Sequence, residues 1–274
     1  MCELLALSFN QEIRPSFSFS GLLMGSEYHA DGWGIGYFPE QSNSAMVFKQ
    51  PVTGQYSELA EFLFTYRGLR SKTFVAHIRK SSKGRLSHDN THPFARNFNG
   101  REWLFAHNGT LHKPTKLKPL SFMPTGDTDS ERAFCFLLSQ LKKLKIKSVV
   151  RSKYVGFKSN DFWSIYDILT DVNVQADGAF NVIFSDGTFL FCYRDVIGAR
   201  KLYYLNRAFP FAHTEPRDSD LLVNLNIEKS RTERGFIVST TPLSTEDWLS
   251  FKPGQLLVFR NGAKVANIGG GAPF

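Results

Sequence analysis

The sequence is poor in cysteine and contains no long apolar run. Its three cysteines, Cys2, Cys135 and Cys192, are odd in number and far apart, which argues against a disulfide framework and fits a reducing compartment. No stretch approaches the roughly 18 apolar residues that a membrane-spanning helix requires, and no signal-peptide pattern opens the sequence. We therefore expect a cytoplasmic protein that makes no membrane contact.

Acidic residues are also fewer than basic ones, at 25 against 33, which gives a formal net charge of +8. Clustered lysine and arginine attract phosphate, so a nucleic-acid partner has to be considered. The densest basic cluster follows an amphipathic segment and comprises Lys142, Lys143, Lys145, Lys147, Arg151 and Lys153. No signature of a nucleic-acid-binding module accompanies it, and a solvated helix end is the simpler interpretation. We do not expect a nucleic-acid partner.

The chain has enough apolar residues to bury a large core. Of its 274 residues, 42% are hydrophobic and 26 are phenylalanine, which predicts an unusually aromatic interior. We expect a single domain over residues 2–274. Within it, the polar and poorly patterned stretch 207–232 predicts a long loop, and residues 269–274 predict a flexible tail.

Apolar patterning predicts strands, then a pair of helices, then strands again. Strands are expected over residues 3–9, 31–38, 73–78, 103–107, 199–205, 235–240, 254–260 and 263–268, and a hairpin over 178–193. Helices are expected over 56–67, 128–141 and 160–174. The strands at 73–78 and 103–107 are each expected to end in polar residues and a glycine-bearing turn. This order is typical of an α+β layered domain built on antiparallel sheets.

The clearest helix start lies at Thr128-Asp129-Ser130-Glu131, which has the form of a capping box. Two other patterns are rejected. Gly32, Gly34 and Gly36 have the wrong spacing for a dinucleotide-binding loop. The histidines at 77, 92 and 107 have no acidic or cysteine partner at a confirming distance, and we interpret them as hydrogen-bonded packing residues rather than a zinc site. We expect no metal and no cofactor.

Cys2 is the most informative residue of the sequence. If Met1 is removed, the thiol and a free α-amine share one carbon, and the amine, with a pKa of about 7.7–8.0, can exchange a proton with a thiol of about 8.5. Such a residue is a nucleophile that carries its own base. The alternative is that Cys2 is an inert thiol, as most intracellular cysteines are, and the position alone does not decide between them.

Four segments carry further chemistry in this order along the sequence: Cys2, Ala76-His77-Ile78-Arg79 followed by Ser82 and Gly84, His107-Asn108-Gly109, and Gly126-Asp127-Thr128-Asp129-Ser130-Glu131. Together they resemble the class II glutamine amidotransferases of the N-terminal nucleophile (Ntn) hydrolase superfamily. The opening Met-Cys-Glu-Leu-Leu and the segment Asp31-Gly32-Trp33-Gly34 are similar to stand-alone bacterial members, akin to the amidohydrolases of ergothioneine synthesis and fungal glutathione breakdown. The resemblance implies a four-layer αββα sandwich of two antiparallel sheets.

The resemblance also implies a role for each matching residue. Cys2 is the nucleophile, the side-chain amide of Asn108 and the backbone N–H of Gly109 form the oxyanion hole, and Arg79, Asp129 and Ser82 bind the substrate. From the residues alone, Asn108-Gly109 could equally be a tight turn. Asp129 could simply complement the dipole of the helix that it begins.

The sequence departs from the family pattern beside Arg79. Lys80 stands where members with a fused synthase domain have tryptophan, and Lys83 replaces a histidine, so a γ-glutamyl compound larger than glutamine remains a candidate substrate. The expected activity is cleavage of a γ-amide through a γ-glutamyl thioester on Cys2, releasing ammonia or an amine. The alternatives are an ammonia-donating subunit, which would need an acceptor or synthase subunit as partner, and a non-enzymatic basic binding protein. A homodimer is left open.

Overall fold

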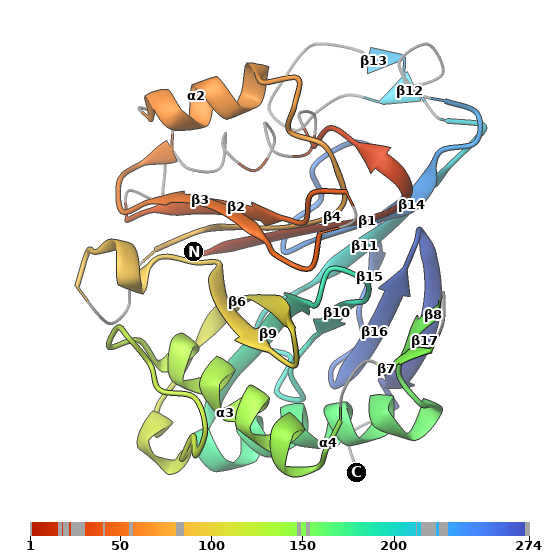
Figure 1. The fold of residues 1–274 in the computed structure, drawn as a ribbon. Coiled ribbons are helices and arrows are strands. Elements are labelled where there is room, and N and C mark those ends of the chain that lie inside the picture. Colours follow the sequence, from red (N-terminus) through yellow and green to blue (C-terminus); the bar gives the residue numbers. More distant parts are fainter. Residues whose placement is uncertain are drawn as a thin grey trace.

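Two antiparallel sheets stack face to face between helices in the computed structural model (Figure 1). The structure describes residues 2–15, 18, 22, 31–40, 42–54, 57–80, 85–146, 149–151, 154–211, 213–214, 223–224 and 230–271. Within these residues no helix is long and apolar enough to cross a membrane.

Over the residues that the structure describes, the first sheet has seven strands, and β1, which begins directly after Cys2, is the central one. In spatial order its strands are β15 (Leu249–Ser250), β11 (Tyr203–Ala208), β14 (Arg234–Ser239), β1 (Glu3–Ile13), β4 (Ser71–Ile78), β2 (Trp33–Tyr37) and β3 (Met46–Gln50). β1 is therefore central, with β14 on one side and β4 on the other, and both neighbours run antiparallel to it.

The second sheet lies beneath the first and carries the aromatic core. Its order is β17 (Ala263–Gly269), β16 (Gln255–Arg260), β10 (Leu190–Tyr193), β9 (Gly178–Ser185), β6 (Arg101–Leu111) and β5 (Phe94–Phe98). Two small antiparallel ribbons accompany the sheets: β7 (Val149–Arg151) with β8 (Tyr154–Gly156), and β12 (His213–Thr214) with β13 (Val223–Asn224).

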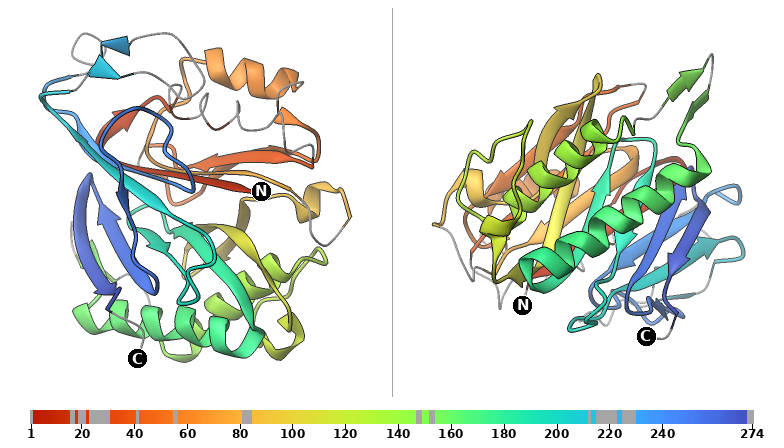
Figure 2. Two further views of the ribbon diagram at one scale, coloured as in Figure 1. Left: turned by 180° about the vertical axis from the view of Figure 1, so that it is seen from behind. Right: turned by 90° about the horizontal axis from the view of Figure 1, so that it is seen from below.

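Helices cover the outer face of each sheet. α2 (Glu58–Thr65) lies over the first sheet, and α3 (Asp129–Lys143) and α4 (Ser159–Ala176) lie side by side over the second (Figures 1 and 2). Short 3₁₀ turns occur at His88–Asn90 and Pro114–Lys116. The arrangement confirms the predicted α+β sandwich with helix, sheet, sheet and helix layers.

The apolar side chains of β1 divide between two cores. Leu4 and Ala6 face the interior between the sheets, whereas Leu5 and Leu7 pack in the cluster that includes Leu63 of α2. Successive strand residues point to opposite faces, so a strand covered on both sides must be apolar throughout. This explains why residues 4–7 are continuously apolar rather than alternating.

Phenylalanine is concentrated between the second sheet and its helices. Phe105 stacks on Phe134 of α3 with ring centroids 4.9 Å apart, and Phe184 stacks on Phe191 at 4.7 Å. Cys135 and Cys192 are fully buried, which confirms that both are packing residues. The aromatic interior expected from the composition therefore lies mainly under α3 and α4.

Several predicted boundaries were wrong in ways that matter for the site. β6 does not end at His107 but continues to Leu111, so Asn108 and Gly109 lie within a strand rather than in a turn. The strand predicted over 199–205 begins only at Tyr203, which leaves residues 199–202 outside it. β3 and β5 were not predicted. The expected loop at 207–232 lies largely outside the described residues.

The predicted capping box is half formed. The hydroxyl of Thr128 accepts the backbone N–H of Glu131 at 3.2 Å, as expected of an N-cap. The Glu131 carboxylate, however, accepts the N–H groups of Thr125 (3.0 Å) and Gly126 (2.7 Å) and pairs with Arg96. Glu131 therefore anchors the loop that precedes α3 instead of closing back on Thr128.

Candidate active site

Strand order places Cys2 between two chain segments that leave the first sheet. Cys2 immediately precedes β1, where Glu3 pairs with Ile78 at the end of β4 and Leu5 pairs with Ser239 at the end of β14. Because the neighbours run antiparallel to β1, their last residues lie beside its first. The residues that follow β4 and β14 therefore lie on opposite sides of Cys2.

The thiol of Cys2 is held by the backbone that follows β4. Its Sγ lies 3.0 Å from both the nitrogen and the carbonyl oxygen of Lys80, accepting from the former and donating to the latter. On the other side, Leu4 N donates to the Thr240 hydroxyl and Thr240 N donates to Leu4 O, both at 3.2 Å. Lys80 thus contacts the sulfur directly, whereas Thr240 fixes the backbone two residues further along the chain.

Burial and charge act in opposite directions on this thiol. Burial raises the pKa of Cys2 above its ordinary value, and the Lys80 N–H together with the positive charges of Arg200 and Arg79 pulls the pKa back down. A thiolate, once formed, is therefore stabilised by two cations and one backbone donor. The sequence reasoning had identified one of these cations, Arg79, but not Arg200.

Asn108 extends from the second sheet to Cys2. Its side-chain Nδ2 donates to the carbonyl oxygen of Cys2 at 2.8 Å, and the residue is only 2% exposed. A primary amide has two N–H groups, so this contact leaves Asn108 with one more donor. Gly109, next along β6, approaches β9 so closely that a Cβ there would lie 1.9 Å from the Ala179 carbonyl oxygen. Only glycine fits this position.

Arg79 lies at the end of β4 and is 3% exposed. Its backbone N–H donates to Gly32 O at 2.7 Å, and its Nη1 donates to Arg85 O at 3.3 Å. Burial lowers the pKa of Arg79, while the negative charges of Asp31, Cys2 and Asp127 oppose that shift. The guanidinium is therefore a buried cation whose charge is partly balanced by nearby acidic groups.

Asp129 begins α3 and points toward β6. Its Oδ2 accepts the backbone N–H of Leu111 at 2.7 Å, and its Oδ1 accepts that of Ser130 at 2.9 Å. Both oxygens thus already have a structural role in joining the helix to the strand. A carboxylate oxygen accepts more than one hydrogen bond, so these contacts leave capacity for a ligand.

A second acidic residue, Asp127, is close enough to Arg79 for its negative charge to raise the pKa of the guanidinium. Its Oδ1 accepts Asn90 Nδ2 at 2.6 Å, its backbone N–H donates to Asn90 Oδ1 at 3.0 Å, and Asn90 Nδ2 also donates to Arg85 O at 3.0 Å. Asn90 thereby ties the segment behind Arg79 to the loop before α3. Motif spacing had not singled out Asp127, although it lies inside the 126–131 segment.

The three histidines are all buried, but they differ in bonding. His107 lies between Ser130 Oγ (2.8 Å from Nδ1) and Ala179 O (3.0 Å from Nε2), and since a carbonyl only accepts, Nε2 carries the proton. His92 packs against His77 with ring centroids 4.2 Å apart and the ring planes tilted by 42°, and neither of its ring nitrogens has a hydrogen-bond partner among the described residues. The expectation of hydrogen-bonded histidines was therefore wrong for His92. No three metal-ligating side chains gather anywhere in the described part of the chain.

A pocket of about 330 Å³ opens beside Cys2 and Asn108. Its walls come from the segment that follows β14, including Thr240 and Pro242, and from residues 199–203. Arg79, Lys80 and Asp129 are not part of its lining. The pocket therefore extends from Cys2 on the side opposite to Arg79.

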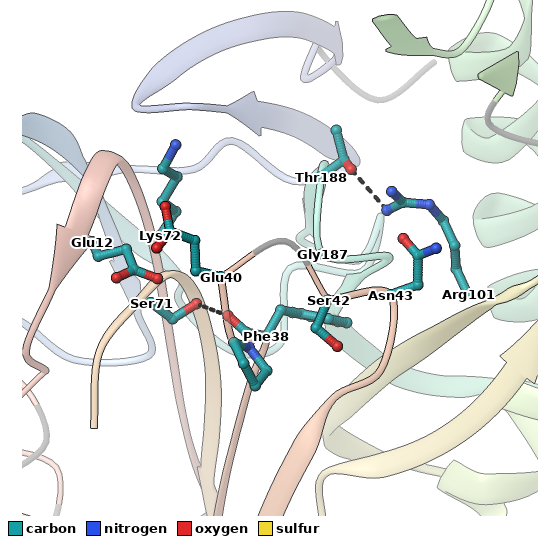
Figure 3. Close-up of a pocket in the computed structure, with 11 residues that line it drawn as sticks. Glu12, Phe38, Glu40, Ser42, Asn43, Ser71, Lys72, Arg101, Gly187 and Thr188 are labelled. Atoms are coloured by element: carbon teal, nitrogen blue, oxygen red, sulfur yellow. Dashed lines mark hydrogen bonds between the residues drawn. The ribbon is translucent and has the colours of Figure 1, made fainter. Parts of the chain in front are cut away.

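A second pocket lies at the far end of β1, where Glu12 is about 30 Å along the strand from Cys2. It measures about 260 Å³ and includes Glu40, Lys72 and Arg101 (Figure 3). Arg101 Nη1 donates to Thr188 Oγ1 at 2.9 Å, which fixes one wall. None of the residues in the four motifs lines it, whereas Cys2 and Asn108 line the pocket described above.

The structure thus brings Cys2 and Asn108 into direct contact, with Gly109 following on the same strand. Arg79 and Asp129 lie on the elements next to them, and Ser82 lies outside the described residues. The sequence reasoning noted Lys80 only as a departure from the family pattern, and it missed Thr240 and Arg200. Only strand pairing brings these residues to Cys2, and no local pattern marks them.

Comparisons with known proteins give a consistent result. The model of the family "Glutamine amidotransferases class-II" matches residues 1–270. An uncharacterized protein of Methanocaldococcus jannaschii is 41% identical over 97% of this chain and 71% of its own length. The crystal structure of a "predicted glutamine amidotransferase" from Pseudomonas aeruginosa has a TM-score of 0.67 at 27% identity and covers 97% of this chain and 100% of the other.

A more distant structure shares the fold. The glutamine phosphoribosylpyrophosphate amidotransferase of B. subtilis has a TM-score of 0.62 at 17% identity, with 100% of this chain matched to 50% of that one. At this identity the likeness concerns the fold alone.

Proposed function

Because this chain belongs to the class II glutamine amidotransferases, we propose that it cleaves the γ-amide of glutamine or of a γ-glutamyl compound with Cys2 as nucleophile. The proposal requires that Met1 is removed, so that Cys2 carries a free α-amine. The observation on which it depends is the meeting of Cys2 with the Asn108 amide, 2.8 Å from the Cys2 carbonyl oxygen, at the mouth of a pocket.

The reaction would proceed in two halves. In the first, the α-amine takes the thiol proton, Sγ attacks the γ-carbonyl carbon and the C–N bond breaks; the Cys2 ammonium gives that proton to the nitrogen, which leaves as ammonia or an amine. In the second, water adds to the γ-glutamyl thioester and releases glutamate and the free thiol. The α-amine accepts a proton from that water and passes it to the departing sulfur, which returns the amine and the thiol to their starting states.

The oxyanion formed in each half needs donors that are already in place. We assign this role to Asn108 Nδ2 and the backbone N–H of Gly109, since burial at 2% exposure and the fit of Gly109 against β9 hold both rigidly. Losing one such donor costs about 10²–10³ in turnover.

The glutamyl head would be held on the β4 side of Cys2. Arg79 is the proposed partner of the α-carboxylate because its planar guanidinium matches a carboxylate in a bidentate manner. Asp129 is the proposed partner of the α-ammonium, with Ser82 as a further substrate contact. We also propose a cytoplasmic location, which the three free cysteines support.

The proposal is tested by mass spectrometry of the intact protein. Mature protein should lack Met1, and a glutamine-analogue diazo-ketone should add once, at Cys2. Cys135→Ser is the matched control, because it removes a buried thiol and should still be labelled. Retention of Met1 throughout folded, active material, or labelling that survives Cys2→Ala, would contradict the proposal and favour a non-enzymatic binding protein.

A further inference from the structure

We propose that the pocket beside Cys2 binds a carboxylate on the leaving amine, so that the preferred substrates are γ-glutamyl amides of amino acids rather than glutamine. The proposal rests on the thioester chemistry proposed above and names its substrate class. It depends on three properties of the pocket: its side, its size and its charge.

The strand order of the first sheet determines on which side of Cys2 the pocket lies. The glutamyl head has its proposed partners after β4 and at the start of α3, whereas the pocket is built by residues after β14 and before β11. Cys2 lies between them. A γ-amide whose carbonyl carbon meets Sγ, and whose head points toward Arg79, directs its nitrogen substituent away from Arg79. The pocket lies in that direction.

The size exceeds what glutamine requires. Ammonia is about as large as a water molecule, which occupies roughly 30 Å³ in the liquid. The pocket measures about 330 Å³. Ala199, Tyr203 and Pro242 give part of it apolar walls, which suit the carbon atoms of an amine larger than ammonia.

The charge favours an anion. Arg200 and Lys201 line the pocket together with one acidic residue, Glu3, so the cations outnumber the carboxylate. Arg200 is close enough to Cys2 for its charge to act on the thiol. An amino acid joined through its nitrogen places its carboxylate two bonds from that nitrogen, within reach of a cation near Sγ.

The segment that carries these cations is held in place. Arg194 donates from Nε to Arg200 O at 3.0 Å and from Nη2 to Gly198 O at 3.0 Å, and Asn181 Nδ2 donates to Arg200 O at 3.4 Å. A preorganised backbone lowers the entropy lost when a ligand binds. The segment at 198–201 is therefore a fixed wall of the pocket.

The test compares donors that differ only in the leaving amine. Met-processed protein is assayed for glutamate release from glutamine, γ-glutamylmethylamide, γ-glutamylglycine and γ-glutamylputrescine. We expect kcat/KM for γ-glutamylglycine to exceed that for the methylamide by about tenfold or more, the range of a charge-assisted hydrogen bond. Using a ratio between two donors cancels any effect on the nucleophile itself.

Variants assign the preference to the pocket. Arg200→Gln should reduce the ratio by about tenfold, and Lys201→Gln, at an exposed position, should reduce it less. Lys118→Gln removes an exposed lysine outside the pocket and should preserve the ratio. The comparison of donors in the unaltered protein needs no variant, so the test holds even if Arg200→Gln fails to fold.

The outcomes separate the two proposals. Turnover of glutamine and of the methylamide without preference for γ-glutamylglycine overturns the carboxylate subsite and leaves the nucleophile proposal standing. A preference for γ-glutamylputrescine also overturns the carboxylate subsite, because the pocket would then select a cationic amine through the negative charge of Glu3. If mature protein turns over none of the four donors, the proposed function fails and this inference fails with it.

Discussion

The two sides of Cys2 are built differently. On the β4 side, Arg79, Asn90 and Asp129 are at most 8% exposed and hydrogen-bonded to the backbone of two other segments, at Arg85 and at Leu111. On the β14 side, a pocket of about 330 Å³ is open and includes the exposed Lys201.

This difference indicates which part of a substrate each side can recognise. A dense set of buried polar groups has one geometry, so it suits a moiety that never varies, such as the glutamyl head. An open pocket with apolar walls tolerates different shapes and selects mainly by charge. The comparison therefore predicts strict recognition of the glutamyl part and broader recognition of the amine, and the experiments below are ordered by the size of the effect that we expect.

Cys2 belongs to both sides, so its loss should remove all activity. Cys2→Ala is expected to lower kcat by about 10⁴ or more, as loss of a nucleophile does in other hydrolases, measured as glutamate release. Cys135→Ala removes a fully buried thiol and should mainly lower the melting temperature. Residual turnover of Cys2→Ala within tenfold of the parent would remove Cys2 from the mechanism.

Asn108 tests the boundary between the two sides. Asn108→Ala should lower kcat by about 10²–10³ with little change in KM, because its proposed contact is made with the oxyanion. The same factor should appear for glutamine and for γ-glutamylglycine. A rise in KM alone would show that Asn108 only binds the ground state.

Replacing Arg79 tests recognition of the glutamyl head on the β4 side. Arg79→Lys keeps the charge but loses the planar fork, so we expect KM to rise by about tenfold for every donor, whatever its amine. Steady-state kinetics with glutamine and γ-glutamylglycine measures this. Unchanged KM for both donors would show that the carboxylate is bound elsewhere.

The packing on the β4 side of Cys2 should also make the stability of the protein sensitive to acid. Burial, with the charges of His77, His107, Lys49 and Arg79, lowers the pKa of His92 well below its ordinary value. Below a pH of about 6.5 the unfolded chain therefore binds a proton that the native state does not. The contribution of neutral His92 to the free energy of unfolding is fully present above the pKa that His92 has in the unfolded chain. It is lost as the pH falls through the pKa that His92 has in the native state.

Thermal melts measure this loss. The melting temperature should fall between pH 7 and pH 5, and each pKa unit of difference corresponds to about 1.4 kcal/mol. His92→Phe keeps a ring against His77 and Phe94 and should flatten the profile, whereas His112→Phe, at an exposed position, should leave it unaltered. An unchanged slope in His92→Phe would contradict this account.

Replacing Arg200 should give the smallest effect, and it tests the charge of the pocket on the β14 side. The positive charge of Arg200 lowers the pKa of the Cys2 thiol, so Arg200→Gln should shift the pH midpoint of alkylation of Cys2 upward. The rate of iodoacetamide labelling against pH measures the midpoint. A shift downward, or none, would place Arg200 too far from Sγ to act on it.

Patterns within single elements predicted much of the fold. Continuous apolar residues revealed β1, the hairpin of β9 and β10 followed from Ser185-Asp186-Gly187-Thr188, and Thr128 marked the start of α3. The hairpin and the helix start are set by interactions between residues close in sequence, whereas the apolar run of β1 reflects burial of both of its faces. β3 and β5 were missed because most of their residues are only partly buried and give no apolar pattern.

The candidate site was predicted only where motifs exist. Cys2, Arg79 and Asn108 stand in recognisable segments, and the structure brings them together where β1 begins and β4 ends. Thr240 and Arg200 lie more than 190 residues along the chain from Cys2. Thr240 reaches it because β14 pairs with β1, and Arg200 precedes β11, which pairs with β14 in turn. The order of strands in a sheet depends on contacts across the whole chain, which no local pattern encodes.

The central claim, a γ-glutamyl thioester on Cys2, is tested most directly by partitioning with hydroxylamine. Mature protein is given glutamine or γ-glutamylmethylamide with hydroxylamine, and γ-glutamyl hydroxamate and glutamate are measured together. A common thioester predicts the same ratio of the two products from both donors, whatever their rates. A ratio that changes with the leaving amine, or glutamate formed without any hydroxamate, would contradict the account.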